Sequence, residues 1–212
     1  MEYQVSSKAK MFTTILLVVG IVFTGIGVIA MVGEHNLGQK FMANLLANSF
    51  FFFGIGISAL FFLALKYATE TGWFVAVKRV IEAIAGWLPY GIVFLLVTLL
   101  TLSFMKGGHV YMWMDPEVMN EDGSHYDELA AGKGAYLNLT FFWIRTLVYL
   151  SVYYIFWKGF QKRSLLQDES PELAVDIHFQ NYKKGALFLV FFAVFSMTSS
   201  WDWIMSIDVH WF

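Results

Sequence analysis

The sequence contains no cysteine among its 212 residues. This absence excludes disulfides, Cys-x-x-Cys redox pairs, thiolate-held iron–sulfur clusters and the Cys-x-x-Cys-His attachment of c-type haem. Charged residues are also scarce, at 14% against about a quarter in soluble domains. The net charge of −2 offers no broad basic surface, so we expect no nucleic-acid partner.

Long apolar runs dominate the composition, which is 58% hydrophobic and 19% aromatic. Five runs approach the ~20 residues that the hydrocarbon core of a bilayer requires. A backbone in lipid must satisfy its own hydrogen bonds, so we expect these runs to be helices. The sequence therefore predicts an all-α, polytopic membrane protein with one transmembrane domain over residues 1–212, spanning the lipid bilayer at about 11–32, 45–67, 80–105, 137–157 and 185–206.

Basic residues are distributed unevenly over the segments between these runs. By the positive-inside rule, the more basic side faces the cytoplasm, which places the N-terminus inside and Phe212 outside. The acidic link 106–136 is then outside and the link 158–184 inside. Ten basic residues lie on one side and three on the other: Lys8, Lys10, Lys66, Lys78, Arg79, Lys158, Lys162, Arg163, Lys183 and Lys184 against Lys40, Lys106 and Lys133.

The final stretch, SMTSSWDWIMSIDVHWF, introduces polar side chains into an apolar run. On a continuous helix, its polar residues would share one face about 80° wide. Ionisable groups at membrane depth are costly, so we expect this face to meet protein or water rather than lipid. The polar face comprises Ser199, Asp202, Ser206 and His210.

Arg145 is the expected partner of Asp202, because the two residues have similar depths on neighbouring helices. A structural ion pair would lock the helices together, whereas a proton relay would open toward the outside. The sequence leaves both interpretations open. Glu82, with Lys78 and Arg79 in the preceding turn, indicates an interfacial ion pair or, less favoured, an inner entrance to a proton path.

Pro89, in the third run, is expected to kink that helix. The histidines do not form a deep pair suited to b-type haem, because four lie in links and one at the outer end of the last run. We therefore predict no catalytic, cofactor-binding or metal-ligating residue. The histidines are His35, His109, His125, His178 and His210.

Several sequence blocks resemble one known family. GWFVAVKRVIEAIAGWLP, YMWMDPE, KGAYLN with FFWIR, LLQD and WDWIMSIDVHWF occur in family order from about Gly72 to the end. They are similar to ActF, the quinone-binding subunit 2 of bacterial alternative complex III, which is an NrfD/PsrC-like membrane subunit. The first two helices share only the apolar character of the family and none of its motifs. In the last block, Val209 replaces the usual proline.

The resemblance implies a subunit of about ten helices in the bacterial cytoplasmic membrane, of which this sequence would be the N-terminal half. Helices two to five would form a four-helix bundle, with helix one peripheral. The complex oxidises quinol and passes electrons to haem c and iron–sulfur subunits, then to cytochrome c or a terminal oxidase. The chain would hold no cofactor and would neighbour an ActC-like membrane subunit. Its implied role is structural, with proton conduction as a second role.

Two other functions remain open from the sequence. Five helices could form one repeat of a secondary transporter, with the polar face as its substrate path. A passive membrane anchor would need no site at all. Co-purification separates these alternatives, because a respiratory subunit travels with haem and iron–sulfur partners.

Overall fold

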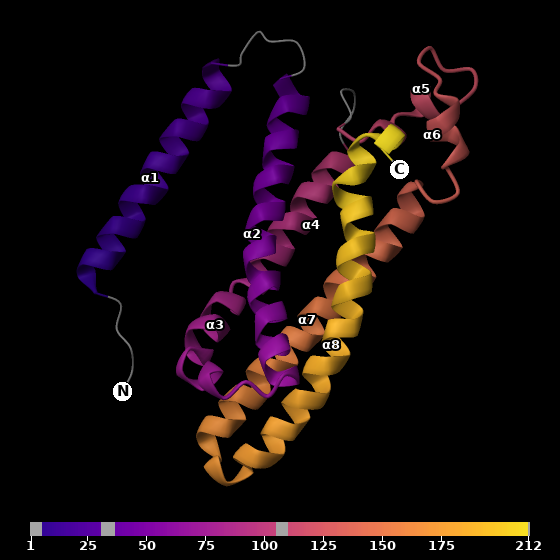
Figure 1. The fold of residues 1–212 in the computed structure, drawn as a ribbon. Coiled ribbons are helices and arrows are strands. Elements are labelled where there is room, and N and C mark those ends of the chain that lie inside the picture. The colour runs from indigo at the N-terminus through magenta and orange to yellow at the C-terminus, as the bar shows by residue number, and fades with distance from the viewer. Residues whose placement is uncertain (1–5, 31–36, 105–109, 212) are drawn as a thin grey trace. The chain divides into compact units, whose positions relative to one another are not determined.

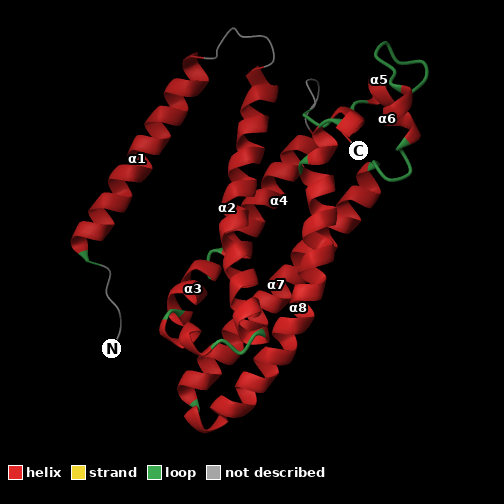
Figure 2. Cartoon of the chain, viewed as in Figure 1, coloured by secondary structure: helices red, strands yellow, loops and turns green. Residues whose placement is uncertain are grey.

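The computed structural model describes residues 6–30, 37–104 and 110–211 (Figure 1). These residues form helices, turns and loops, and none of them lies in a strand (Figure 2). Within these described ranges, five helical spans are long and apolar enough to cross a membrane. The structure therefore confirms the predicted all-α, membrane-spanning fold class. The predictions that fell on His35, Lys106, His109 and Phe212 concern residues outside the described ranges.

The chain divides into two compact units, residues 1–41 and 42–212. The first contains α1 (Ser7–Ala30), a continuous helix in which threonine hydroxyls donate to backbone carbonyls one turn earlier. This pairing lets a polar side chain lie in an apolar helix without an unmet hydrogen bond. Helix one thus belongs to a different compact unit from the bundle, and its expected peripheral position stays a prediction.

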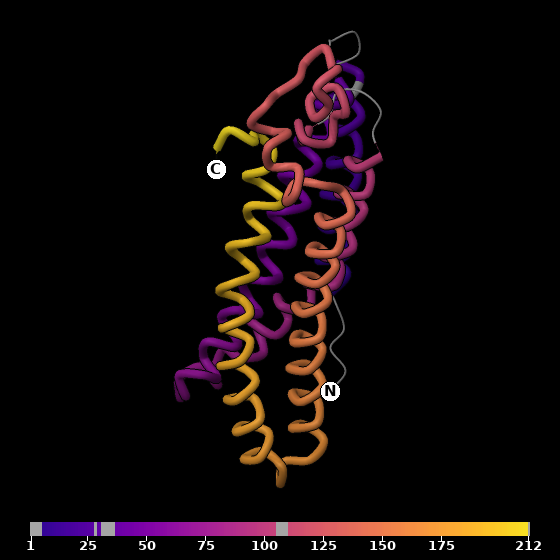
Figure 3. The backbone as a smooth tube through the Cα atoms, turned by 90° about the vertical axis from the view of Figure 1, so that its right-hand side faces the viewer, coloured from indigo at the N-terminus to yellow at the C-terminus, as the bar shows by residue number. Residues whose placement is uncertain are grey.

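The second unit is a bundle formed by α2 (Leu37–Ala68) from residue 42 onward, α3 (Lys78–Ala85) with α4 (Leu88–Phe104), α7 (Leu139–Glu169) and α8 (Ala174–Trp203). Helices α7 and α8 lie side by side along their length, as Figures 1 and 3 both show. Aromatic side chains fill the centre, where Phe53 and Trp203 meet edge to face with ring centroids 5.7 Å apart. The prediction that helices two to five form one bundle is confirmed.

Helices α7 and α8 extend well beyond their predicted ends on the side of the turn that joins them. Only residues 170–173, which include the turn η3 (Pro171–Leu173), separate them, so most of 158–184 is helix rather than an irregular link. The extension buries side chains one turn apart on each helix, Phe160 with Ser164 and Ile177 with Asn181. This amphipathic spacing stabilises helix even where the other face is charged.

The third span is interrupted at Gly86 and Trp87, between α3 and α4. Pro89 lies in the first turn of α4 and has no backbone N–H, so a helix cannot continue through it undisturbed. The predicted kink is thus a break. A Cβ on Gly56 would lie 2.8 Å from Leu88 Cα, so only glycine lets α2 approach the start of α4 this closely.

The acidic link is folded rather than irregular. Residues 110–138 contain η2 (Met112–Met114), α5 (Pro116–Met119) and α6 (Glu128–Gly132). They pack with η4 (Met205–Ile207) and η5 (Val209–Trp211), which follow α8. We call residues 110–138 and 204–211 the cap, and the adjoining end of the bundle the cap end. The opposite end, with the α7–α8 turn and η1 (Gly72–Ala76), is the hairpin end.

Candidate functional site

The main polar site is a buried ion pair at the cap end. Arg145 on α7 donates from Nε to Asp202 Oδ2 over 2.8 Å and from Nη2 to Asp202 Oδ1 over 2.7 Å. Asp202 on α8 is fully buried, and the Arg145 side chain is only 9% exposed. This two-point geometry is the strongest arrangement for an arginine and a carboxylate. The predicted pairing and the predicted burial of Asp202 are both confirmed.

Other groups enclose the pair. Arg145 Nη1 donates to the backbone carbonyl of Tyr136 over 3.2 Å, and the Tyr149 hydroxyl donates to Asp202 Oδ2 over 3.3 Å. The guanidinium lies 3.8 Å from the ring centroid of Tyr136 and 4.1 Å from that of Phe141. Arg145 therefore connects α7 to α8 and to the cap at the same time.

The predicted polar face is wrong beyond Trp203, because α8 ends there. Ser206 lies in η4 and His210 in η5, so they do not continue the helical face. Ser199 and Ser206 donate to the backbone carbonyls of Ser196 and Asp202, over 3.3 Å and 2.6 Å, rather than to the Asp202 carboxylate. Ser199 and Ser206 are both buried, which agrees with the expectation that they meet protein or water rather than lipid.

His210 is 46% exposed and belongs to the cap rather than to the buried site. Its Nε2 lies 2.8 Å from Asp127 Oδ2, and its Nδ1 lies 3.1 Å from Asp208 Oδ1. Asp127 also accepts from the backbone N–H groups at the start of α6. The Ala130 N–H above all, and the neighbouring His210, hold the pKa of Asp127 below its usual range.

Further bonds join the cap to the bundle. The Tyr111 hydroxyl donates to the Trp203 carbonyl over 2.8 Å, and Lys133 Nζ donates to the Val209 carbonyl over 2.5 Å. Trp203 Nε1 donates to Thr146 Oγ1 over 3.0 Å. This folded cap was not predicted from the sequence. The helix-capping pattern at Asp115-Pro116 was the available signal, since Asp115 accepts from the Glu117 N–H.

Glu82 lies at the hairpin end, where the structure brings it next to α7. Its Oε2 accepts from Arg79 over 2.9 Å, and its Oε1 accepts from Ser164 over 2.7 Å. Arg79 also forms an ion pair with Asp168. The favoured interpretation, an interfacial ion pair, fits this geometry. The partners on α7 could not be deduced from the sequence, because one sequence does not show which residues of two distant helices face each other.

Glu82 and Asp202 lie at opposite ends of the bundle, so the candidate proton-path residues do not form one group (Figure 1). Glu82 lines a cavity of about 250 Å³, together with Arg79, Ser164 and aliphatic and aromatic side chains of α2, α3 and α7. Among the described residues, no three His, Asp or Glu side chains are grouped so that they could hold a metal ion.

No protein-family model matches this chain, and a search of curated proteins finds no match. Its function must therefore be argued from its residues and their arrangement.

Proposed function

We propose that this chain is a membrane subunit of a quinol:cytochrome c oxidoreductase of the alternative complex III type, and that its role is structural. The observation that supports this is the spatial convergence of the sequence blocks that carry the resemblance. YMWMDPE contributes Tyr111, FFWIR contributes Arg145, and WDWIM contributes Asp202 and Trp203. These side chains bond directly, Tyr111 to Trp203 and Arg145 to Asp202.

Two other blocks meet at the hairpin end. VKRVIE provides Lys78 and Arg79, and LLQD provides Gln167 and Asp168. Lys78 donates to Gln167 over 2.8 Å, and Arg79 pairs with Asp168. The blocks thus form two groups of contacts, one at each end of the bundle. Such contacts are expected where motifs maintain an architecture rather than a reaction centre.

The geometry of Asp202 favours a structural clamp over a proton relay. Its carboxylate is held by two bonds from Arg145 and one from Tyr149, and protonation would weaken all three. The clamp joins α7, α8 and the cap through one guanidinium. In this proposal the cap faces outward and supports the haem c and iron–sulfur subunits, with the N-terminus in the cytoplasm of a bacterium. Quinol oxidation and electron transfer belong to partner subunits, including an ActC-like one.

Purification of the tagged full-length protein from its native membranes tests the assignment. We expect it to retain subunits with haem c absorption and iron–sulfur electron paramagnetic resonance signals, and to reduce cytochrome c with added quinol. A protein that purifies without redox partners, or that moves a solute in proteoliposomes, would contradict the proposal and favour the transporter alternative.

An Asp202→Asn variant tests the clamp within that complex. We expect it to lose the peripheral haem c subunit during purification, whereas the complex that stays assembled releases protons normally per electron. Asp176→Asn removes the same charge from an exposed position on α8 and should leave assembly intact. Normal assembly combined with slowed proton release in Asp202→Asn would show that the carboxylate is a relay.

A further inference from the structure

A basic cavity of about 160 Å³ lies at the hairpin end, between the end of α2, η1, the start of α3 and the α7–α8 hairpin. Lys66, Lys78, Gln167 and His178 contribute to its wall, and Glu70 is its acidic member. No part of the proposed clamp lies in this cavity. The cavity does share Lys78 and Gln167 with the contact that closes the hairpin end.

Two lysines make the cavity an anion site. The Lys78 side chain is only 12% exposed, and its Nζ donates to Gln167 Oε1 over 2.8 Å. Because this bond uses the amide oxygen, the Gln167 NH₂ group remains a donor that can serve an anion. Lys66 Nζ lies 4.9 Å from the ring centroid of Phe62 and 4.7 Å from that of Trp73, so its ammonium is fixed at the cavity rim.

The cavity wall holds two lysines against one glutamate. Glu70 is 58% exposed and lies 3.6 Å from His178 Nε2, so it is partly engaged by the histidine. Glu82 lies 3.7 Å from Lys78 but is shared with Arg79. A phosphate group matches this balance of charge and donors.

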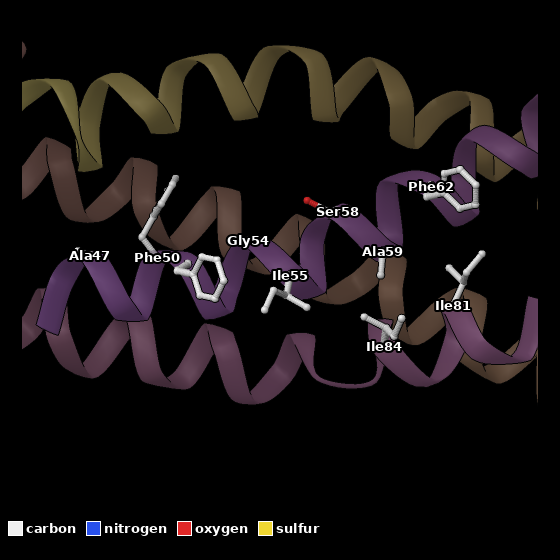
Figure 4. A pocket seen from close by; sticks show the side chains of 10 residues that line it. Ala47, Phe50, Gly54, Ile55, Ser58, Ala59, Phe62, Ile81 and Ile84 are labelled. Carbon is white, nitrogen blue, oxygen red and sulfur yellow. The ribbon is translucent and has the colours of Figure 1, made fainter. Parts of the chain in front are cut away.

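An apolar groove of about 700 Å³ runs along the same side of α2. Figure 4 shows its wall extending from Ala47 to Phe62 on α2 and meeting Ile81 and Ile84 on α3. Fifteen residue steps of helix span about 22 Å, which exceeds the ~15 Å depth of one lipid leaflet. Gly54 lies in this wall, where an added Cβ would meet no atom within 4 Å.

The groove and the basic cavity meet at Phe62. This residue lines the groove, and its ring contacts both Lys66, at 4.9 Å, and Phe74, with ring centroids 6.4 Å apart. Lys66 and Phe74 line the cavity. On α3, Lys78 of the cavity lies one turn before Ile81 of the groove. A site for phosphate thus continues directly into a channel for a hydrocarbon chain.

We propose that this composite site binds one anionic phospholipid, with its phosphate between Lys66 and Lys78 and one acyl chain along the groove. Free phosphate would satisfy the lysines but would leave the groove unused. A choline lipid would bring its own cation next to two ammonium groups. Phosphatidylglycerol satisfies both parts of the site without this repulsion.

Photo-crosslinking of the full-length protein in mild detergent tests the site. The probe is phosphatidylglycerol with a diazirine on one acyl chain, and crosslinked peptides are mapped by mass spectrometry. We expect labelling to concentrate between residues 47 and 62, and excess unlabelled phosphatidylglycerol to compete about 10-fold better than phosphatidylcholine. Equal competition, or equal labelling of exposed Leu147 and Ile155 on α7, would show only non-specific boundary lipid.

Matched variants separate the two parts of the site. Lys66→Gln with Lys78→Gln should weaken competition by phosphatidylglycerol by about 10- to 30-fold, whereas Lys162→Gln with Lys184→Gln removes the same charge from exposed positions and should have no effect. Gly54→Leu should fill the groove and also reduce labelling, without disturbing the lysines. Displacement of the probe by inorganic phosphate, together with unchanged labelling in Gly54→Leu, would overturn the lipid proposal in favour of a phosphate site.

Discussion

The two ends of the bundle use similar charged groups in different environments. At the cap end, Arg145 and Asp202 are buried and bonded at two points. At the hairpin end, Arg79 and Asp168 are each 53% exposed, and Glu82 is shared among several partners. An ion pair in a closed site cannot exchange its partner for water, whereas one in an open site can. The first is therefore expected to act as a clamp and the second as an adaptable surface.

The largest effect is expected from breaking the closed pair. Arg145→Gln leaves the Asp202 carboxylate buried without a counter-ion, which should cost about 3–5 kcal/mol of unfolding free energy. Denaturant unfolding in detergent, followed by tryptophan fluorescence, measures this loss. Lys162→Gln on the exposed face of α7 is the control.

The double variant Arg145→Leu, Asp202→Leu sharpens the comparison. Removing both charges leaves no uncompensated group, so it should be more stable than Arg145→Gln. A loss below 1 kcal/mol for Arg145→Gln itself would mean that water enters the cap end and that the two ends do not differ.

An intermediate effect is expected where the cap meets the bundle. Tyr111→Phe removes the bond to the Trp203 carbonyl, which should cost about 1 kcal/mol and expose the cap to protease. Limited proteolysis of residues 120–127 measures this change. Tyr126→Phe alters a tyrosine that is 39% exposed in the same cap and should leave the cleavage rate unchanged. Equal cleavage of the Tyr111 variant and the wild type would show that other contacts hold the cap.

A smaller effect is expected at the open cluster. Arg79→Gln should cost only about 0.2–1 kcal/mol, because exposed ion pairs gain little over hydration. The loss should disappear near 1 M salt, where the screening length is about 3 Å. Unfolding of both variants at low and high salt compares the two ends directly. A salt-dependent loss in Arg145→Gln as well would remove the distinction.

The smallest effect is expected on the stability of the cap when the pH is lowered. The pKa of Asp127 is lowered, first by the Ala130 N–H and also by the Leu129 N–H and His210. A lowered folded-state pKa contributes stability above the unfolded value of about 3.9 and loses it as the pH falls through the folded value. Asp127→Asn should therefore lower the melting temperature at pH 6 but make little difference near pH 2. An equal deficit at both pH values would contradict this linkage.

Hydropathy predicted the five spans because their length and apolarity follow directly from bilayer thickness. The Arg145–Asp202 pair could also be predicted, since two isolated charges at similar depth have few other partners. The end of α8 at Trp203 could not be predicted, because the spacing of Ser206 and His210 in the sequence also fits a helix that continues past Trp203. Tertiary bonds from the cap decide that boundary. The lipid site was likewise hidden, since its lysines and its groove come from separate elements.

The long α7–α8 hairpin has a mechanical consequence. Its helices contain 31 and 30 residues, about 46 Å and 45 Å, whereas the hydrocarbon core is ~30 Å thick. Basic residues occupy its flanks at 158–163 and 183–184, and acidic ones lie nearer the turn at 168–176. Moving the hairpin toward the membrane would carry the ammonium groups, which lie nearer the apolar core, into hydrocarbon first and the carboxylates after them. Moving it away would pull the ammonium groups out of the headgroup region. Because either shift is costly, the hairpin is expected to fix the depth at which the bundle sits in membranes of differing thickness.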